Sequence, residues 1–371
     1  MADINPRRLV RVHPERVTDV SSTDFPGHYP GEDHSWDHKL FKKNLKLSVK
    51  RLSQRSIEFD LVGVDASIAN AFRRIMIAEV PTICIEEVYV WNNTSVIQDE
   101  VVAQRLGLIP LNVDPDLFET RGVNDSATDR NTLVFKLNVA CTKKPNVPAG
   151  TIDAEKLYEN STVTAGHLEW VPQGEQEELQ AFKIKPPAST NPNIVIAKLR
   201  PGQEMEMELH CIKNVGKEHA KWSPVATASY RLLPHITLYP KTSFNTQLKR
   251  IPPEHADKFA SCFSPGVIRV DPVTKAVSVD PKGVRGETMS REVFRHPEFT
   301  DCFGLGRVRD WFMFTVESEG PYAPEDIFPA SIRVMRSKIA NLKKATERLM
   351  GMTESDEPQQ DTTEDVQMAD T

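Results

Sequence analysis

The chain has 371 residues, of which 39% are hydrophobic and 26% charged, and its formal net charge is −6. This length allows about two domains with a sizeable core, and the sequence contains no run of about 18 apolar residues that could cross a bilayer. The five cysteines are scattered with no Cys-x-x-Cys pair, and the start has no apolar signal core. We therefore expect reduced thiols inside the cell and exclude membrane proteins and disulfide-stapled secreted domains.

The net negative charge comes from the C-terminal tail. Residues 351–371 contain seven acidic residues and no Lys or Arg, whereas the rest of the chain has 45 acidic and 46 basic residues. The body of the protein therefore has no global field that would attract nucleic acid. The tail itself is predicted to be disordered.

The first 44 residues are rich in Pro, Asp, His and Gly and show little periodicity. They predict an extended N-terminal arm with at most short local structure. His28, His34 and His38 could approach one another there, since the last two are spaced i, i+4. The arm has no cysteine, however, and we do not assign a zinc site to it.

Alternating apolar residues begin at residue 45. Leu45, Leu47 and Val49 alternate with polar residues, and Ile57, Phe59 and Leu61 do so again after a turn near residues 53–56. This period of two predicts a strand pair or one bent strand.

An amphipathic helix is predicted over residues 65–80. Asp65 or Ser67 can cap its first turn, and Pro81 lacks the amide needed to continue it. Four large apolar residues share the i, i+4, i+7 and i+8 spacing of one helical face, namely Ile68, Phe72, Ile75 and Met76. This apolar stripe needs a partner surface, and the pattern alone favours packing on the chain's own sheet over contact with another chain.

Two arginines follow one another on the same helix. Arg73 and Arg74 leave the helix about 100° apart, because 3.6 residues make a turn. An adjacent cationic pair beside an apolar stripe suits docking better than catalysis.

Further strands are predicted after this helix. Period-two alternation predicts strands near residues 83–90, 133–139, 194–199 and 205–211, the last with a charged outer face. Between them, residues 114–131, 143–165 and 172–193 have the composition of surface loops in an elaborated, mostly β domain.

The last folded part contains a strand and a long helix. Residues 311–316 are apolar almost throughout, as in a strand covered on both faces. The helix is predicted from about 324 to 350, with its start left open between Pro324 and Pro329, and Gly351 is placed to cap its end. Its apolar residues lie on a roughly seven-residue repeat, namely Phe328, Ile332, Met335, Ile339, Leu342 and Leu349.

A loop at residues 216–224 combines cations with an indole. It contains Lys217, His219, Lys221 and Trp222. Such a loop could grip phosphate and stack a base, could form a protein contact, or could be a simple surface loop. No repeat of basic and aromatic spacing supports nucleic acid.

The sequence offers no candidate catalytic, cofactor or metal site. His210 and Cys211 would point to opposite faces of a strand, which does not suit a nucleophile and its base. The run Gly304-Leu305-Gly306-Arg307 lacks the third glycine of a dinucleotide site, and no GxSxG, HExxH or GxxxxGK[ST] motif is present. Catalysis within this chain is not expected.

Three long segments resemble the alpha-subunit signature of cellular RNA polymerases. They are residues 70–76 (NAFRRIM), 79–82 (EVPT) and 99–111 (DEVVAQRLGLIPL), and residues 216–224, 226–234 and 309–320 extend the resemblance. The chain is similar to the large alpha-like polymerase subunits over about residues 45–350. Within that family it resembles the subunits shared by eukaryotic RNA polymerases I and III. The polymerase II counterpart has a zinc-binding cysteine cluster, and here Cys141 and Cys211 stand alone.

The resemblance implies an α+β fold. A discontinuous dimerisation domain, an antiparallel sheet with two amphipathic helices, would occupy residues 45–87 and 224–350. A mostly β inserted domain would interrupt it at 88–223.

The resemblance also implies a non-catalytic core subunit. It would pair with a small alpha-like subunit and form the platform for the second-largest and largest subunits, in synthesis of ribosomal RNA precursors, 5S rRNA and tRNAs. Small zinc-binding adaptor subunits would be further partners, and DNA would be contacted only indirectly. The implied location is the nucleus, in nucleolus and nucleoplasm, after assembly in the cytoplasm.

The family's interfaces carry over to particular residues. The implied contacts with the small partner are Ile68, Phe72, Ile75, Met76, Ile332, Met335, Ile339 and Leu342. The implied docking residues for the large subunits are Arg73, Arg74, Glu100, Arg105, Lys217, His219, Lys221 and Trp222. The last four also form the rival nucleic-acid-binding loop.

Overall fold

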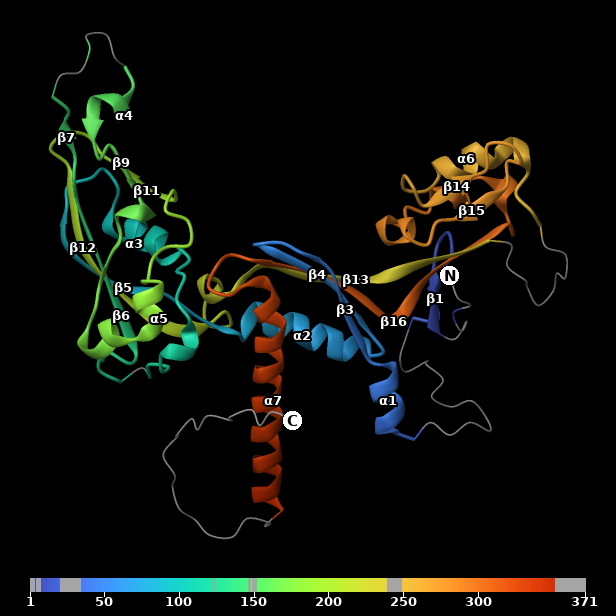
Figure 1. The fold of residues 1–371 in the computed structure, drawn as a ribbon, viewed down its shortest axis with the longest axis horizontal. Helices are drawn as coiled ribbons and strands as arrows, with labels where there is room; N and C mark the ends of the chain where they lie inside the picture. The colour runs from blue at the N-terminus through green and yellow to red at the C-terminus, as the bar shows by residue number, and fades with distance from the viewer. Residues whose placement is uncertain are drawn as a thin grey trace.

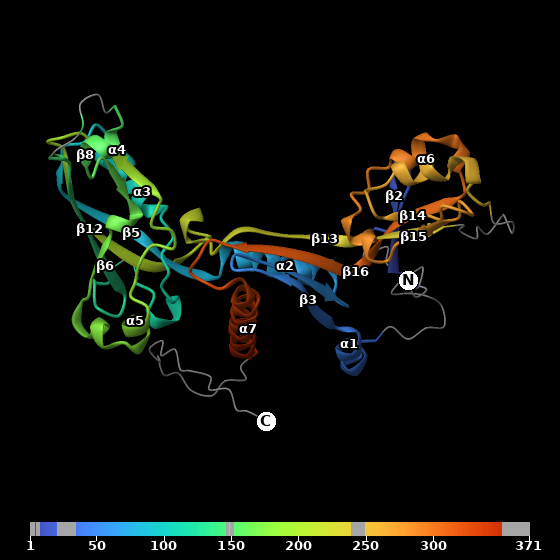
Figure 2. The same ribbon diagram turned by 45° about the horizontal axis from the view of Figure 1, so that its top comes forward.

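The computed structural model describes residues 8–20, 35–122, 124–145, 152–238 and 249–350, together with residues 4 and 148. A central sheet with two helices lies between a second sheet and a small lobe (Figures 1 and 2). Three features expected from the sequence lie outside the described residues: the acidic tail, the cap at Gly351, and the histidines His28 and His34.

The central sheet is antiparallel and gathers strands from both ends of the chain. Its order is β2-β1-β16-β4-β3, with β13 also paired to β16. The strands are β1 (Leu9–Val12), β2 (Val17–Thr18), β3 (Lys46–Leu52), β4 (Ser56–Val62), β13 (Val225–Leu238) and β16 (Phe303–Ser318). This sheet and its helices confirm the predicted α+β class.

The β3–β4 hairpin forms where the sequence predicts a turn. The Ser53 amide donates to the Ser56 carbonyl at 2.8 Å, which closes the turn. Ile57, Phe59 and Leu61 then point to one face of β4 and are almost fully buried. The alternation of apolar and polar residues in this part of the sequence thus corresponds to a half-buried strand.

Helices α2 (Ala66–Ala78) and α7 (Pro324–Leu349) pack on the apolar face of this sheet. Asp65 caps α2 by accepting from the Ser67 amide at 2.9 Å. The Phe59 ring contacts those of Phe314 and Phe328, with centroids 5.0 and 4.9 Å away. Helix α7 begins at Pro324 and contains Pro329, which decides between the two predicted starts. Among the described residues, no helix is long and apolar enough to cross a bilayer.

The second sheet, of order β10-β6-β12-β5, lies beyond α2. Its strands are β5 (Pro81–Asn93), β6 (Thr132–Ala140), β10 (Glu169–Val171) and β12 (Glu204–Val215). In β12, Met205, Met207 and Leu209 are buried and Glu204 and Glu206 are exposed, as the alternation predicts.

The predicted boundary of the inserted domain at residue 88 falls inside a strand. The second sheet already begins at Pro81, and Ile83 and Ile85 belong to its core. Smaller elements surround this core, namely α3 (Asp99–Gly107), β7 (Thr142–Lys143), α4 (Ala154–Leu157), β8 (Tyr158–Glu159), β9 (Thr162–Thr164), α5 (Gln180–Ile184) and β11 (Val195–Lys198).

Residues 249–302 form a third lobe that the sequence analysis did not separate from the dimerisation domain. It contains α6 (Ala256–Ser261), β14 (Ile268–Val270) and β15 (Val277–Val279), joined by short 3-10 turns. Phe259, Val284 and Phe299 are fully buried in a core that the lobe shares with the ends of β1, β13 and β16. Elements of three to six residues are too short to give a periodic pattern, which is why the lobe was missed.

The N-terminal arm is more structured than the sequence predicts. Val10 and Val12 of β1 are buried because β1 pairs with β16. Residues 38–44 form the seven-residue helix α1 (His38–Asn44). These pieces are short, as expected, but β1 is part of the central sheet.

Candidate protein interface

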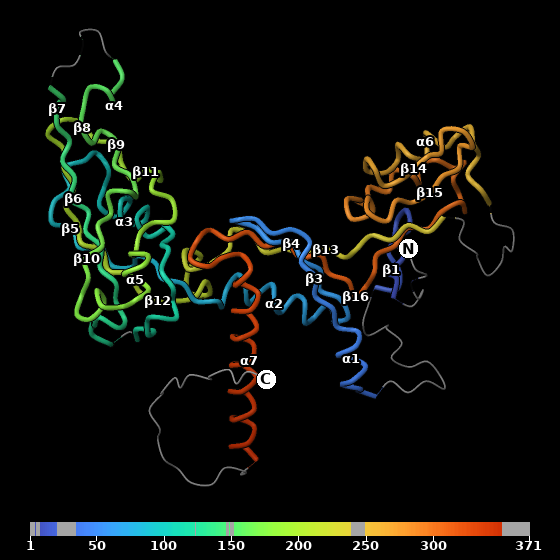
Figure 3. Tube along the Cα trace, in the orientation of Figure 1, coloured from blue at the N-terminus to red at the C-terminus, as the bar shows by residue number. Residues whose placement is uncertain are grey.

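Helix α2 packs against the first half of α7. The Phe72 and Phe328 rings meet edge to face at 5.1 Å, and the Lys338 ammonium pairs with the Glu79 carboxylate at 2.7 Å. Beyond this contact α7 leaves the body of the protein, as the Cα trace in Figure 3 shows. All side chains from residue 336 to residue 346 are exposed.

The eight residues that the sequence analysis assigned to a small partner divide into two groups. Met76 is fully buried in the core of the central sheet, and Ile75 is buried against Val80 and Ala330. Both are committed to this chain's own fold, which corrects their assignment to a partner surface.

The other six remain accessible to different degrees. Ile339 and Leu342 are 60% and 69% exposed. Ile68 and Ile332 are also exposed, while Phe72 and Met335 are half-buried between the helices. The accessible apolar surface therefore extends along the outer side of α2 and down α7.

Strand β3 adds apolar residues that the sequence analysis did not assign to an interface. Leu47, Val49 and Leu52 are each 52% exposed. They lie opposite Leu61, Phe59 and Ile57 of β4, whose side chains face the helices. The alternation of these residues was visible in the sequence. Their exposure was not, because it follows from the position of β3 at the edge of the sheet.

The adjacent arginines differ in their surroundings. Arg73 is half-buried and donates to the side-chain oxygen of Asn70 through Nε at 3.1 Å and Nη2 at 3.0 Å. Arg74 is exposed. No carboxylate among the described residues pairs with either guanidinium, so both charges are available to another chain.

Glu100 and Arg105 lie on α3, in the second sheet's domain. Glu100 is exposed in the first turn, where its charge complements the helix dipole. Arg105 donates from Nη1 to the Ile196 carbonyl at 2.9 Å, which ties α3 to β11. The rest of its side chain remains exposed.

The loop before β13 is anchored to the fold by its two most distinctive residues. Trp222 is 3% exposed and donates from Nε1 to the Ile212 carbonyl at 3.3 Å. Lys221 donates to the Ile85 carbonyl at 2.8 Å, pairs with Glu86 and lies 4.4 Å from the Trp222 ring centroid. An indole in this position cannot stack on a base, which corrects the base-stacking role considered for Trp222. The docking of Lys221 and Trp222 to a large subunit stays a prediction.

Two residues of the same loop do face solvent. Lys217 and His219 are exposed, although the His219 Nδ1 accepts from the Lys221 amide at 3.1 Å. They remain candidates for contact with another protein.

The cysteines are buried and show no sign of reactivity. All five are free and buried, and burial raises the pKa of Cys84 to about 11 and that of Cys211 well above its ordinary value. Among the residues that the structure describes, no group of three or more His, Cys, Asp or Glu side chains could hold a metal ion.

A family model matches the part of the chain that carries this surface. The model of the RNA polymerase Rpb3/Rpb11 dimerisation domain matches residues 58–339, well over half of the chain. The chain belongs to the Rpb3/Rpb11 dimerisation family. The match begins in β4 and ends within α7, so it includes both helices of the accessible surface.

Curated relatives cover nearly the whole chain. A protein of Saccharomyces cerevisiae named DNA-directed RNA polymerases I and III subunit RPAC1 is 46% identical over 339 residues, 90% of this chain and 97% of its own length. The human protein of that name is 46% identical over 324 residues, 87% of this chain and 90% of its own. In Dictyostelium discoideum, DNA-directed RNA polymerase II subunit rpb3 is 33% identical over 314 residues, 80% of this chain and 93% of its own.

Proposed function

We propose that this chain is the large alpha-like subunit shared by RNA polymerases I and III. It is non-catalytic and pairs with a small alpha-like subunit to form the platform for the two largest subunits. The higher identity to the polymerase I and III relatives than to the polymerase II relative supports this member of the family. The subunit would contribute to synthesis of ribosomal RNA precursors, 5S rRNA and tRNAs through the assembled polymerases, without catalysing it.

The proposal rests mainly on the exposed distal half of α7, residues 336–346. An isolated helix of this length has only marginal stability in water, because nucleation is unfavourable and few hydrogen-bonded turns follow it. Ile339 and Leu342 add apolar side chains to an exposed surface there. A partner helix lying along α7 would bury this stripe and stabilise the helix at the same time.

The small partner would cover one continuous face of the molecule. That face comprises the outer side of α2 with Ile68, the distal part of α7, and the β3 row of Leu47, Val49 and Leu52. Ile75 and Met76 support it from beneath by holding α2 on the sheet. The partner therefore binds a preformed surface.

The large subunits and small zinc-binding adaptors would contact polar residues around this face. Arg73 and Arg74 are suited to oriented hydrogen bonds with carboxylates or carbonyls. Glu100 and Arg105 on α3, and Lys217 and His219 in the loop, would supply further charged contacts to these subunits. The protein would act in the nucleus, in nucleolus and nucleoplasm, after assembly in the cytoplasm.

Co-purification of a charge variant tests the partner surface. Leu342→Asp places a carboxylate in the proposed apolar contact and should abolish recovery of the small alpha-like subunit. Ser337→Asp is the matched control, since it adds the same charge to the opposite, exposed side of α7. An intact heterodimer with Leu342→Asp, or equal losses in both variants, would contradict the assignment.

Subunit identification tests the choice of polymerase. Affinity purification of the full chain should recover the largest subunits of polymerases I and III and not that of polymerase II. Recovery of polymerase II in comparable amounts would overturn the assignment to the shared subunit.

A further inference from the structure

Strand β3 has one unpaired edge. It is the last strand of the central sheet and pairs only with β4 among the described residues, so its outer N–H and C=O groups face solvent. The segment 38–52, which contains α1 and β3, has six Lys or Arg residues and no Asp or Glu. No carboxylate among the described residues pairs with four of them, Lys39, Lys42, Lys43 and Lys46.

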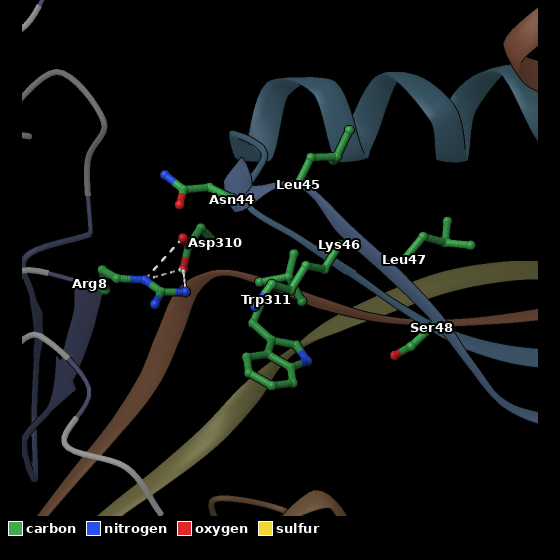
Figure 4. Close-up of a pocket in the computed structure, with 9 residues that line it drawn as sticks. Arg8, Asn44, Leu45, Lys46, Leu47, Ser48, Asp310 and Trp311 are labelled. Atoms are coloured by element: carbon green, nitrogen blue, oxygen red, sulfur yellow. Dashed lines mark hydrogen bonds and ion pairs between the residues drawn. The ribbon is translucent and has the colours of Figure 1, made fainter. Parts of the chain in front are cut away.

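A cavity of about 770 Å³ lies beside this edge. Lys46 of β3 is in register with Val62 of β4, and Val62 with Trp311 of β16, so the three side chains leave the same face of the sheet. Leu47 points to the opposite face, towards α2. Figure 4 shows the cavity, whose lining is Arg8, Asn44, Leu45, Lys46, Leu47, Ser48, Val62, Asp310 and Trp311.

One residue beside the cavity has an unmet hydrogen-bond donor, and another carries an unbalanced charge. The Trp311 Nε1 is buried and has no acceptor among the described residues, and such an unmet donor costs about 1–3 kcal/mol. On the cavity wall, the Arg8 guanidinium and the Asp310 carboxylate neutralise each other at 2.8 Å. The Lys46 ammonium therefore remains as the uncompensated charge.

We propose that the free edge of β3 and this cavity dock an extended, acidic polypeptide segment from a polymerase subunit other than the small alpha-like partner. The segment adds to β3 as a further strand and places carboxylate oxygens near Lys46. The inference rests on the proposed function, since that supplies the other subunits.

The geometry favours a polypeptide over a nucleic acid strand. A nucleic acid also carries acceptors, but it has no row of alternating N–H and C=O groups to match the edge of a strand. A cavity of this volume accommodates several side chains. Lys46, Val62 and Trp311 line it from the face away from α2 and α7, so this side of the cavity stays accessible when the small partner covers Leu47.

Photocrosslinking in the purified polymerase tests the proposal. The full chain carries benzoylphenylalanine in place of Ser48, which lines the cavity. We expect a crosslink to a single segment that contains Asp or Glu, in a subunit other than the small partner. Lys46→Glu should reduce its yield about tenfold, the effect of losing roughly one charge-assisted contact. The matched control Lys198→Glu, at an exposed lysine of β11, should leave the yield unchanged.

The outcomes separate this inference from the proposed function. If the polymerase subunits co-purify but Ser48 gives no crosslink, or gives one to nucleic acid or to a segment without acids, the docking site is refuted and the proposed function stands. Equal yields with Lys46→Glu and Lys198→Glu refute it as well. If the unmodified chain recovers no polymerase subunits, both proposals fail.

Discussion

Truncating Ile339 and Leu342 should weaken association with the small partner without destabilising this chain. Burial of a whole Leu or Ile side chain contributes about 1.5–3 kcal/mol. These two are 60% and 69% exposed in the free chain, so a partner that covers them would gain about 1–2 kcal/mol from each. If the two effects add, the double alanine variant loses about 2–4 kcal/mol, which is about 30-fold to 700-fold in Kd.

The assay is dissociation of fluorescently labelled heterodimer on dilution, with Met76→Ala as the contrasting variant. Met76 is fully buried in the chain's own core, so its truncation should cost about 2–5 kcal/mol of folding stability. We expect Ile339→Ala/Leu342→Ala to raise Kd while the Tm of the isolated chain stays unchanged. An unchanged Kd, or a lower Tm of the isolated chain, would refute the partition of these residues between core and interface.

Three further predictions concern the fold that supports the interface. Arg285→Ala should cost about 1–3 kcal/mol of stability, because it removes the guanidinium that lies 2.7 Å from the fully buried Asp60 and leaves that carboxylate only the Lys50 ammonium at 3.7 Å. Arg269→Ala in the same lobe removes a guanidinium that is 68% exposed and should have a smaller effect. Hydrogen exchange in residues 249–302 measures both, and equal effects would contradict the difference. Burial raises the pKa of Cys84 to about 11, so only about one part in a thousand of this thiol is thiolate at pH 8. Iodoacetamide should therefore modify Cys84 only after denaturation. Rapid alkylation of Cys84 in the folded protein would be inconsistent with this burial. Hydrogen bonds from Ser67 in the first turn of α2 lower the pKa of Asp65 below 3.8. The capping contribution of Asp65, about 1 kcal/mol, is therefore complete above pH 3.8 and is lost as the pH falls through the lowered value. In urea unfolding, Asp65→Ala should match the unmodified protein in stability at low pH and be less stable at neutral pH.

Local patterns predict the elements of the two sheets well because each element carries its own period. The stripe on α2, the alternation in β12 and the hairpin turn at Ser53 depend on residues close in sequence. The resemblance to the polymerase alpha subunits adds the connection between distant parts. It supplies the interrupted domain, which periodicity alone does not indicate.

The division of an apolar stripe between core and interface could not be predicted locally. Phe72, Ile75 and Met76 have the same helical spacing as Ile68, yet only Ile68 is exposed, because the sheet and α7 cover the rest of the stripe. The spacing specifies a face about 100° wide and does not say which chain covers it. For the same reason Phe72→Asp would be a poor interface test, since it also disrupts the contact with Phe328.

The two proposed binding sites lie on opposite faces of the central sheet, and that separation has an energetic consequence. The small partner would cover the face of α2, α7 and Leu47, whereas the docking segment would bind beside Lys46 and Trp311 on the other. Alternate residues of one edge strand serve both sites, because successive side chains of a strand point to opposite faces. Apart from Leu47, which also lines the cavity, occupants on opposite faces share no side-chain contacts, so their binding free energies should nearly add, as they do for independent sites. A coupling energy well above about 0.5 kcal/mol between Leu342→Ala and Lys46→Glu would show that the two sites communicate through β3.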